Sequence, residues 1–210
     1  MTDGAVDWLV VDLGGVAAAY RPERRLAALE RETGIPQEII NHRLFESGLD
    51  RDAELGFHTI ESITAALAEA LEHRISIASL IEAWALAFEP NRDLLDAIAQ
   101  LQPRRTLFTN NGPMMDLCLS GPLAQLASSF DTVMCSWHLA AAKPDSAAFA
   151  RAASRLTSAP PQLLLVDDTR ANVDAARTAG WRALTHVTTE RTLARLGSSA
   201  GSAASAQTSR

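Results

Sequence analysis

The sequence predicts an α/β protein whose core is a parallel β-sheet covered by helices. Three short apolar runs carry this prediction, at residues 8–11, 105–108 and 163–166. The first run, Trp-Leu-Val-Val, lacks alternation between polar and apolar residues, which is typical of a strand buried on both faces. Polar residues follow each run, namely Asp12, then Thr109 and Asn110, then Asp167 and Asp168. Because ligands bind beyond the carboxyl ends of strands in open parallel sheets, we expect these side chains to gather at one edge of the sheet.

Apolar periodicity and turn residues define the other elements of the core. Pro103 and Gly180 each end a predicted helix, and Gly121-Pro122 interrupts another. The segment 197–210 consists mostly of Ser, Ala and Gly, so it buries too little apolar surface to offset the entropy of ordering. We expect strands at 130–136 and 181–187, and helices at 91–101, 114–126, 172–179 and 189–196. The segment 141–156 contains Lys143-Pro144-Asp145 and then a further helix, which Pro144 opens.

Residues 19–88 predict a group of helices inserted after the first strand. From Tyr20 to about Phe88 the apolar residues recur with helical spacing, and no segment has the pattern of a strand. Thr59 and Ser76 are candidate N-caps of two of these helices. The predicted organisation is a core formed by residues 1–18 and 89–196, a helical cap formed by residues 19–88, and a flexible tail at 197–210.

The composition favours a globular protein over a nucleic-acid-binding or membrane protein. Hydrophobic residues make up 47% of the 210 residues, and the formal net charge is -6. The arginines are scattered among acidic residues, so no basic surface for nucleic acid is expected. No apolar run approaches the ~20 residues that span a bilayer. The N-terminus lacks the pattern of a signal peptide, and the two cysteines form no CxxC motif, so we expect two thiols in a cytoplasmic protein.

The polar residues at the strand ends have the chemistry of a phosphoryl-transfer site. Carboxylates at adjacent strand ends suit Mg²⁺, which binds a few carboxylates and keeps waters or phosphate oxygens as its other ligands. A carboxylate such as Asp12 can also act as a nucleophile and form a covalent acyl phosphate. Thr109, Asn110 and Lys143 offer donors and a positive charge to the phosphoryl group. Lys143 precedes Pro144, which opens the next predicted helix, so the ammonium lies near a helix N-terminus.

Taken singly, each of these residues also has a structural interpretation. An Asp or Asn after a strand is commonly a turn former or an N-cap, and a single lysine is commonly a solvated surface residue. Their combination at three strand ends and one helix start favours a functional site.

These segments resemble the motifs of haloacid dehalogenase (HAD) superfamily hydrolases. Asp12 in Asp-Leu-Gly-Gly-Val matches the nucleophile motif, Thr109-Asn110 the second motif and Lys143-Pro144 the third. The resemblance implies a Rossmann-like core with a small helical cap, and an aspartyl-phosphate intermediate on Asp12. The fourth motif is matched by Asp167 and Asp168 with Asn172, Ala175, Ala176 and Gly180.

The resemblance also implies a set of metal and phosphate ligands. Mg²⁺ would be held by Asp12, the backbone carbonyl of Gly14 and Asp168. By its register with Asn172, Asp168 is expected to bind the metal directly, and Asp167 to act indirectly or through water. The residues implied to contact the phosphoryl group are Thr109 and Lys143.

Gly14 departs from the usual pattern of phosphatases in this family. They carry an Asp two residues after the nucleophile, which serves as general acid and then as general base, and Gly14 can do neither. This loss is tolerable if the leaving group is already a good one, as in sugar 1-phosphates and acyl phosphates, or if another group or water supplies the proton. A subgroup with the pattern Asp-Leu-Gly-x-Val includes sugar-1-phosphate phosphatases. We therefore expect a Mg²⁺-dependent phosphatase of a small phosphorylated metabolite, with a sugar phosphate as the leading substrate class.

Two alternatives remain open. A 2-haloacid dehalogenase would use Asp12 to attack carbon without Mg²⁺, but such enzymes carry an aromatic residue at the position of Gly14. A non-catalytic member would bind a phosphorylated ligand or a protein, but Asp12, Lys143 and Asp168 are all present. We expect the cap to select the substrate, with Tyr20, Arg21 and the segment 45–58 near the cleft. The sequence does not indicate the oligomeric state.

Overall fold

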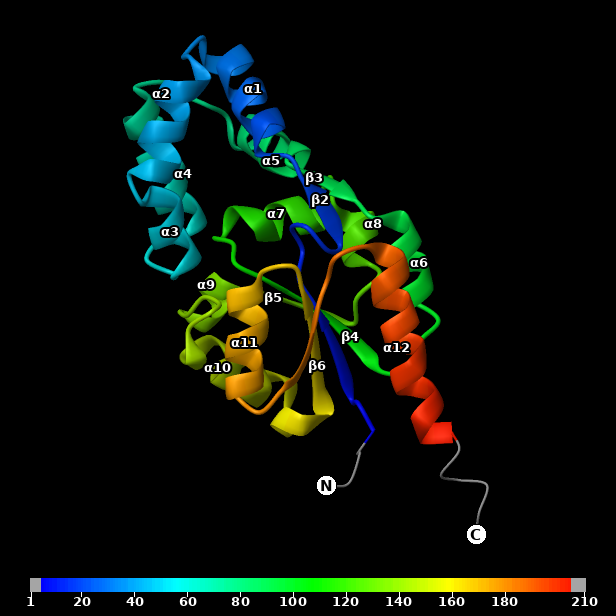
Figure 1. Cartoon of the computed structure of the whole chain (residues 1–210). Helices are drawn as coiled ribbons and strands as arrows, with labels where there is room; N and C mark the ends of the chain where they lie inside the picture. Colours follow the sequence, from blue (N-terminus) through cyan, green and yellow to red (C-terminus); the bar gives the residue numbers. More distant parts are fainter. Residues whose placement is uncertain (1–4, 205–210) are drawn as a thin grey trace.

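A parallel sheet forms the centre of the chain in the computed structural model, which describes residues 5–204, with side chains from residue 198 onward excepted. Its five strands lie in the order β5-β4-β1-β6-β7, and every neighbouring pair is parallel (Figure 1). This confirms the predicted α/β class. The strands are β1 (Trp8–Val11), β4 (Arg104–Thr109), β5 (Thr132–Cys135), β6 (Leu163–Asp167) and β7 (Arg182–Thr185).

Helices cover both faces of this sheet. Side chains alternate across the central strand, so Leu9 and Val11 pack into one apolar layer while Trp8 and Val10 pack into the other. Both layers are closed to water, which explains why the strand reads as an unbroken apolar run. The covering helices are α6 (Arg92–Ile98), α7 (Met114–Ser120), α8 (Ala124–Ala127), α9 (Ser136–Leu139), α10 (Ser146–Leu156), α11 (Arg170–Thr178) and α12 (Thr189–Ala204), with a 3₁₀ turn η2 at Pro160–Gln162.

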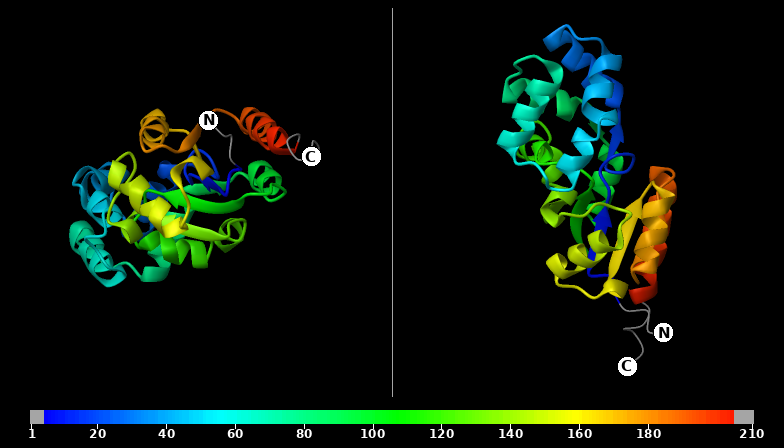
Figure 2. Two further views of the ribbon diagram at one scale, coloured as in Figure 1. Left: turned by 90° about the horizontal axis from the view of Figure 1, so that it is seen from below. Right: turned by 90° about the vertical axis from the view of Figure 1, so that its left-hand side faces the viewer.

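The segment between the first two core strands folds as a group of helices above the sheet, which we call the cap helices (Figures 1 and 2). Two of their N-caps are as predicted, because Thr59 accepts a hydrogen bond from the Ser62 backbone N–H and Ser76 accepts one from that of Ser79. Their apolar stripes merge with one layer of the core. The cap helices are α1 (Pro22–Thr33), α2 (Gln37–Asn41), the π-helical turn η1 (His42–Glu46), α3 (Leu49–Glu54), α4 (Ile60–Leu71) and α5 (Ile77–Leu86).

Two details differ from the prediction. A short antiparallel ribbon, β2 (Ala18–Tyr20) with β3 (Phe88–Pro90), joins the cap helices to the sheet, although no strand was expected near these residues. Helix α12 continues to Ala204, past the expected end at Leu196 and into the segment predicted to be a flexible tail. The remainder of that segment, 205–210, lies outside the described residues. Within the part of the chain that is described, we find no helix whose length and apolarity would suit a bilayer.

Candidate active site at the carboxyl ends of the strands

The structure brings the predicted polar residues together in a cleft between the sheet and the cap helices. Asp12 follows β1, and its backbone N–H donates a hydrogen bond of 3.0 Å to the carbonyl of Val166 on β6. This bond fixes the start of the loop after β1. The cleft has a volume of about 470 Å³. Its lining includes Asp12, Gly14, Thr109, Asn110, Lys143 and Asp168 from the predicted set, with Gly15, Asn111, Thr169 and Asn172 beside them.

Lys143 is buried at the floor of this cleft rather than solvated. Its ammonium Nζ donates to Asp12 Oδ1 at 2.8 Å, to Asp167 Oδ2 at 2.6 Å and to the Phe108 carbonyl at 2.8 Å. The side chain is only 1% exposed, so these three acceptors account for its three N–H groups. The neighbouring carboxylates oppose the effect of burial and raise the pKa of Lys143, which therefore stays charged.

Asp12 lies at the edge of this buried charge cluster and faces the cleft. Its side chain is 13% exposed, whereas that of Asp167 is fully buried. Burial is the largest influence on Asp12 and raises its pKa to about 6, although Lys143 acts in the opposite direction. A cation bound beside Asp12 would favour its ionised form.

The two adjacent carboxylates after β6 have different environments. Asp167 accepts hydrogen bonds from Lys143, from the Thr169 backbone N–H and, through both oxygens, from the Asn172 amide. Asp168 is exposed, and its carboxylate accepts only a long bond of 3.3 Å from the Thr169 hydroxyl among the described contacts. Asp167 is therefore engaged with the protein, while Asp168 has free lone pairs for a ligand.

Gly15 allows Asp168 to lie against the loop after β1. Its φ is +81°, and a Cβ at this position would lie 2.2 Å from Asp168 Oδ2. Only glycine provides both this left-handed backbone and this close approach. One ligand oxygen from each of Asp12, Asp167 and Asp168 lies within 4.8 Å of the other two, and carboxylate oxygens are the ligands that a hard cation prefers.

Thr109 and Asn110 both lie at the cleft, but their side chains are engaged differently. The Thr109 hydroxyl accepts a bond of 2.7 Å from the Asn111 amide and keeps its own proton for a ligand. The Asn110 side chain makes two hydrogen bonds to the backbone of Lys143. Its Nδ2 donates to the Lys143 carbonyl at 2.7 Å, and its Oδ1 accepts from the Lys143 N–H at 2.9 Å. Asn110 thus holds Lys143 in place instead of presenting its amide to the cleft.

The cap side of the cleft contains residues that the sequence did not single out. Tyr20 lines the cleft as expected, but Arg21 does not, and Arg25 does. From the segment 45–58, Asp50 and Glu54 line it. These two carboxylates are one helical turn apart on α3, and a search of that segment for i, i+4 pairs of charged residues would have found them.

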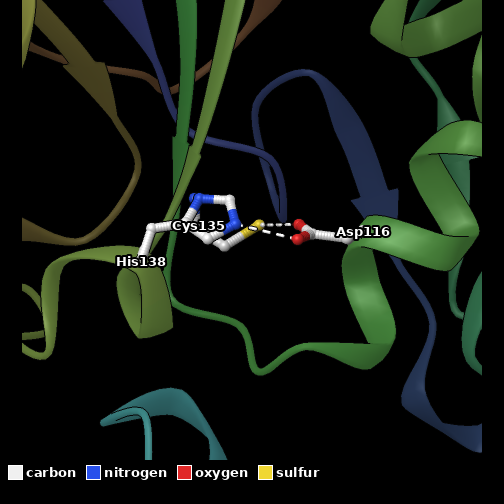
Figure 3. A group of neighbouring side chains, drawn as sticks. All are labelled: Asp116, Cys135 and His138. Carbon is white, nitrogen blue, oxygen red and sulfur yellow. Dashed lines mark hydrogen bonds and ion pairs between the residues drawn. The ribbon is translucent and has the colours of Figure 1, made fainter. Parts of the chain in front are cut away.

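A second cluster of polar side chains lies outside the cleft and consists of Asp116, Cys135 and His138 (Figure 3). His138 Nε2 lies 2.8 Å from Asp116 Oδ2, and the Cys135 thiol donates to Asp116 Oδ1 at 3.5 Å. The backbone N–H of Cys135 donates to His138 Nδ1. Hydrogen bonding within the cluster thus accounts for its geometry, and these bonds tie α9 to α7. Neither His138 nor the adjacent Trp137 lines the cleft.

The comparisons with known proteins identify the fold. No protein-family model and no curated protein matches the sequence. A predicted HAD-like family hydrolase from Porphyromonas gingivalis superposes with a TM-score of 0.76 at 25% identity, over 92% of this chain and 98% of that one. A HAD family enzyme from Bacteroides thetaiotaomicron, in complex with magnesium and inorganic phosphate, superposes with a TM-score of 0.71 at 18% identity. The superposition covers 87% of this chain and 95% of that one.

A more distant similarity is to the L-2-haloacid dehalogenase of Xanthobacter autotrophicus, with chloropropionic acid covalently bound. It gives a TM-score of 0.60 at 20% identity, over 92% of this chain and 83% of that one. At this identity the likeness concerns the fold alone. The chain has the HAD-like hydrolase fold, and its structural neighbours are hydrolases of that type.

Proposed function

We propose that this protein is a Mg²⁺-dependent phosphomonoester hydrolase that acts on a small phosphorylated metabolite through a phosphorylated Asp12. The observation that carries the proposal is the buried ion pair between Lys143 and Asp12, which faces a cleft also lined by Asp168. A carboxylate held in one orientation by a buried ammonium suits a nucleophile better than a structural salt bridge, because one side of it remains open to the cleft.

The residues present fit a magnesium ion. The Asp168 carboxylate is nearly free of protein donors and lies against Gly15, so it can act as a direct ligand together with Asp12 and the Gly14 carbonyl. Asp167 would act indirectly, since its oxygens already accept bonds from Lys143 and Asn172. Magnesium would supply neutralisation of the negative charge on the phosphoryl oxygens.

In the proposed reaction, a carboxylate oxygen of Asp12 attacks phosphorus, and the bond from phosphorus to the leaving-group oxygen breaks. Lys143 holds Asp12 in position and stabilises the charge that develops on the phosphoryl oxygens. The Thr109 hydroxyl is placed to donate to one of those oxygens. Water then attacks phosphorus in the acyl phosphate, which regenerates the Asp12 carboxylate and releases inorganic phosphate.

Gly14 restricts the leaving group. No side chain at this position can donate a proton, so a leaving group that is stable as an anion, or that takes its proton from water, reacts best. Sugar 1-phosphates and acyl phosphates meet this condition, and the Asp-Leu-Gly-Gly-Val segment resembles that of sugar-1-phosphate phosphatases. The two free cysteines suit a reducing compartment, so we place the activity in the cytoplasm.

The test is phosphate release from sugar phosphates, nucleotides and acetyl phosphate, with and without Mg²⁺, for the wild type and Asp12→Asn. We expect release that requires both the metal and Asp12, while Asp52→Asn, an exposed change on α3, leaves it intact. Folded wild-type protein that releases no phosphate from any of these substrates with Mg²⁺ present would refute the proposal. Halide release from 2-haloacids without metal would favour a dehalogenase instead.

A further inference from the structure

Arg25 on α1 is a buried cation on the cap side of the cleft. The residue is 3% exposed, and its guanidinium lies among four aromatic rings. Its Cζ is 4.7 Å from the ring centroid of Trp84, 5.4 Å from that of Phe45, 5.9 Å from that of Phe88 and 6.0 Å from that of Tyr20. These rings stabilise the charge and fix the plane of the guanidinium, but they accept no conventional hydrogen bonds.

The guanidinium lacks acceptors for its N–H groups. Among the described residues, none accepts a hydrogen bond from Arg25, and its Nε is buried without a partner. A buried donor without an acceptor is costly, and arginine has five donors in a fixed fork. Since Arg25 lines the same cleft as Asp12 and Lys143, a bound molecule with oxygen acceptors would satisfy it.

Asp50 on α3 provides a second unengaged charge on the same wall. It lines the cleft and has no hydrogen bond or ion pair to a described residue, so its oxygens are free to accept. Burial raises the pKa of Asp50, and the nearby Arg25 opposes this shift. The two side chains thus interact through space without forming a contact ion pair.

The charges on this wall balance, and this determines what it can bind. Arg25 is offset by Asp50, and Glu54 is paired with Arg51 at 2.9 Å. A second anionic group on the substrate would gain from Arg25 but would be repelled by Asp50, whose charge offsets that of Arg25. A hydroxyl group both accepts and donates, so it can accept from the guanidinium and donate to the carboxylate without adding charge.

We propose that Arg25 and Asp50 together bind the hydroxyl groups of an uncharged, polyhydroxylated leaving group and so determine the substrate specificity of the cleft. This inference rests on the proposed phosphatase function and extends it from the phosphoryl group to the rest of the substrate. The rings of Tyr20 and Phe88, whose centroids are 5.3 Å apart, line the cleft and offer an apolar surface to the C–H groups of a sugar.

The test compares each variant with the wild type on two kinds of substrate. The first is a sugar phosphate, and the second comprises acetyl phosphate and p-nitrophenyl phosphate, which carry no hydroxyl on the leaving group. We expect Arg25→Met and Asp50→Asn each to lower kcat/KM for the sugar phosphate by about 10- to 100-fold. For the hydroxyl-free substrates we expect a change below about threefold, because phosphoryl transfer does not involve these side chains.

Several controls separate recognition from folding. Arg31→Met on the same helix and Asp52→Asn on α3 remove exposed charges and should leave both substrates unaffected. Arg25→Lys keeps a charge in the aromatic surroundings, so it tests the role of the guanidinium if Arg25→Met does not fold. Inhibition by inorganic phosphate should be unchanged in all folded variants, because the proposed phosphoryl site consists of Asp12, Lys143 and Asp168 and includes neither Arg25 nor Asp50.

The outcomes distinguish this inference from the function on which it rests. Equal losses on both kinds of substrate in a folded variant would show that Arg25 and Asp50 are structural, and would overturn the inference. Wild-type preference for substrates with a second phosphate or a carboxylate would overturn it as well. If the wild type hydrolyses none of the phosphates, the phosphatase function itself fails.

Discussion

An aspartate at position 14 should give this protein the general acid that it lacks. Gly14 does not have a positive φ, and a Cβ added to it would lie 3.5 Å from the Tyr20 Cβ and 3.7 Å from Phe88 Cε1, both ordinary contact distances. We therefore expect Gly14→Asp to fold, with a change in the free energy of unfolding within about 1 kcal/mol. General acid catalysis accelerates a reaction by about 10²- to 10⁴-fold. For substrates with poor leaving groups, kcat/KM of Gly14→Asp should therefore exceed that of the wild type by a factor that approaches this range.

The assay is a series of phosphate monoesters whose leaving groups span a range of pKa values. In the wild type, log kcat/KM should fall steeply as the leaving-group pKa rises, because nothing protonates the departing oxygen. Gly14→Asp should flatten this dependence and leave acetyl phosphate nearly unchanged. Gly14→Ala is the matched control, since it adds the Cβ without the carboxylate. A folded Gly14→Asp protein with the wild-type dependence, or a flattening that Gly14→Ala reproduces, would refute the reasoning.

Three further predictions concern the floor of the cleft. Gly15→Ala should weaken Mg²⁺ binding measured by calorimetry, because the new Cβ would lie 2.2 Å from Asp168 Oδ2 in a backbone with φ of +81°; unchanged affinity would contradict this. Lys143→Met should lower the free energy of unfolding in urea by about 3–5 kcal/mol, because it removes the counter-charge of Asp12 and of the buried Asp167, and a loss below about 1 kcal/mol would contradict a stabilising role of these buried ion pairs. Mg²⁺ affinity should rise as the pH passes through about 6 and level off only once Asp12 is fully ionised, since the pKa of Asp12 is raised to about 6 and the protonated form cannot bind the metal; an affinity that does not change across this range would contradict a role for Asp12 as a ligand.

The sheet and the floor of the cleft were predictable because local signals and topology agree there. The run at Trp8–Val11 is buried on both faces, as its unbroken apolarity indicates. Since parallel strands end at the same edge, Asp12, Thr109 and Asp168 had to meet once the strands were identified. The N-caps at Thr59 and Ser76 depend only on nearby residues, so the sequence predicted them as well.

Other features depend on tertiary contacts that no sequence window contains. Lys143 taken alone resembles a solvated lysine, and its burial follows from the two carboxylates brought to it by β1 and β6. The β2–β3 ribbon has only three residues in each strand and pairs segments on opposite sides of the cap helices. The burial of Arg25 was not predictable either, because the four rings around it come from four other elements, β2, η1, α5 and β3. Such an environment exists only once the cap helices are packed.

The central claim is that Asp12 carries the phosphoryl group during turnover. The most direct measurement is an acid quench of the protein during hydrolysis of acetyl phosphate with Mg²⁺, followed by mass spectrometry of the peptide that contains Asp12. We predict that this peptide gains the mass of one phosphoryl group in the wild type and that Asp12→Asn shows neither the gain nor phosphate release. Phosphate release that continues in Asp12→Asn would contradict the account.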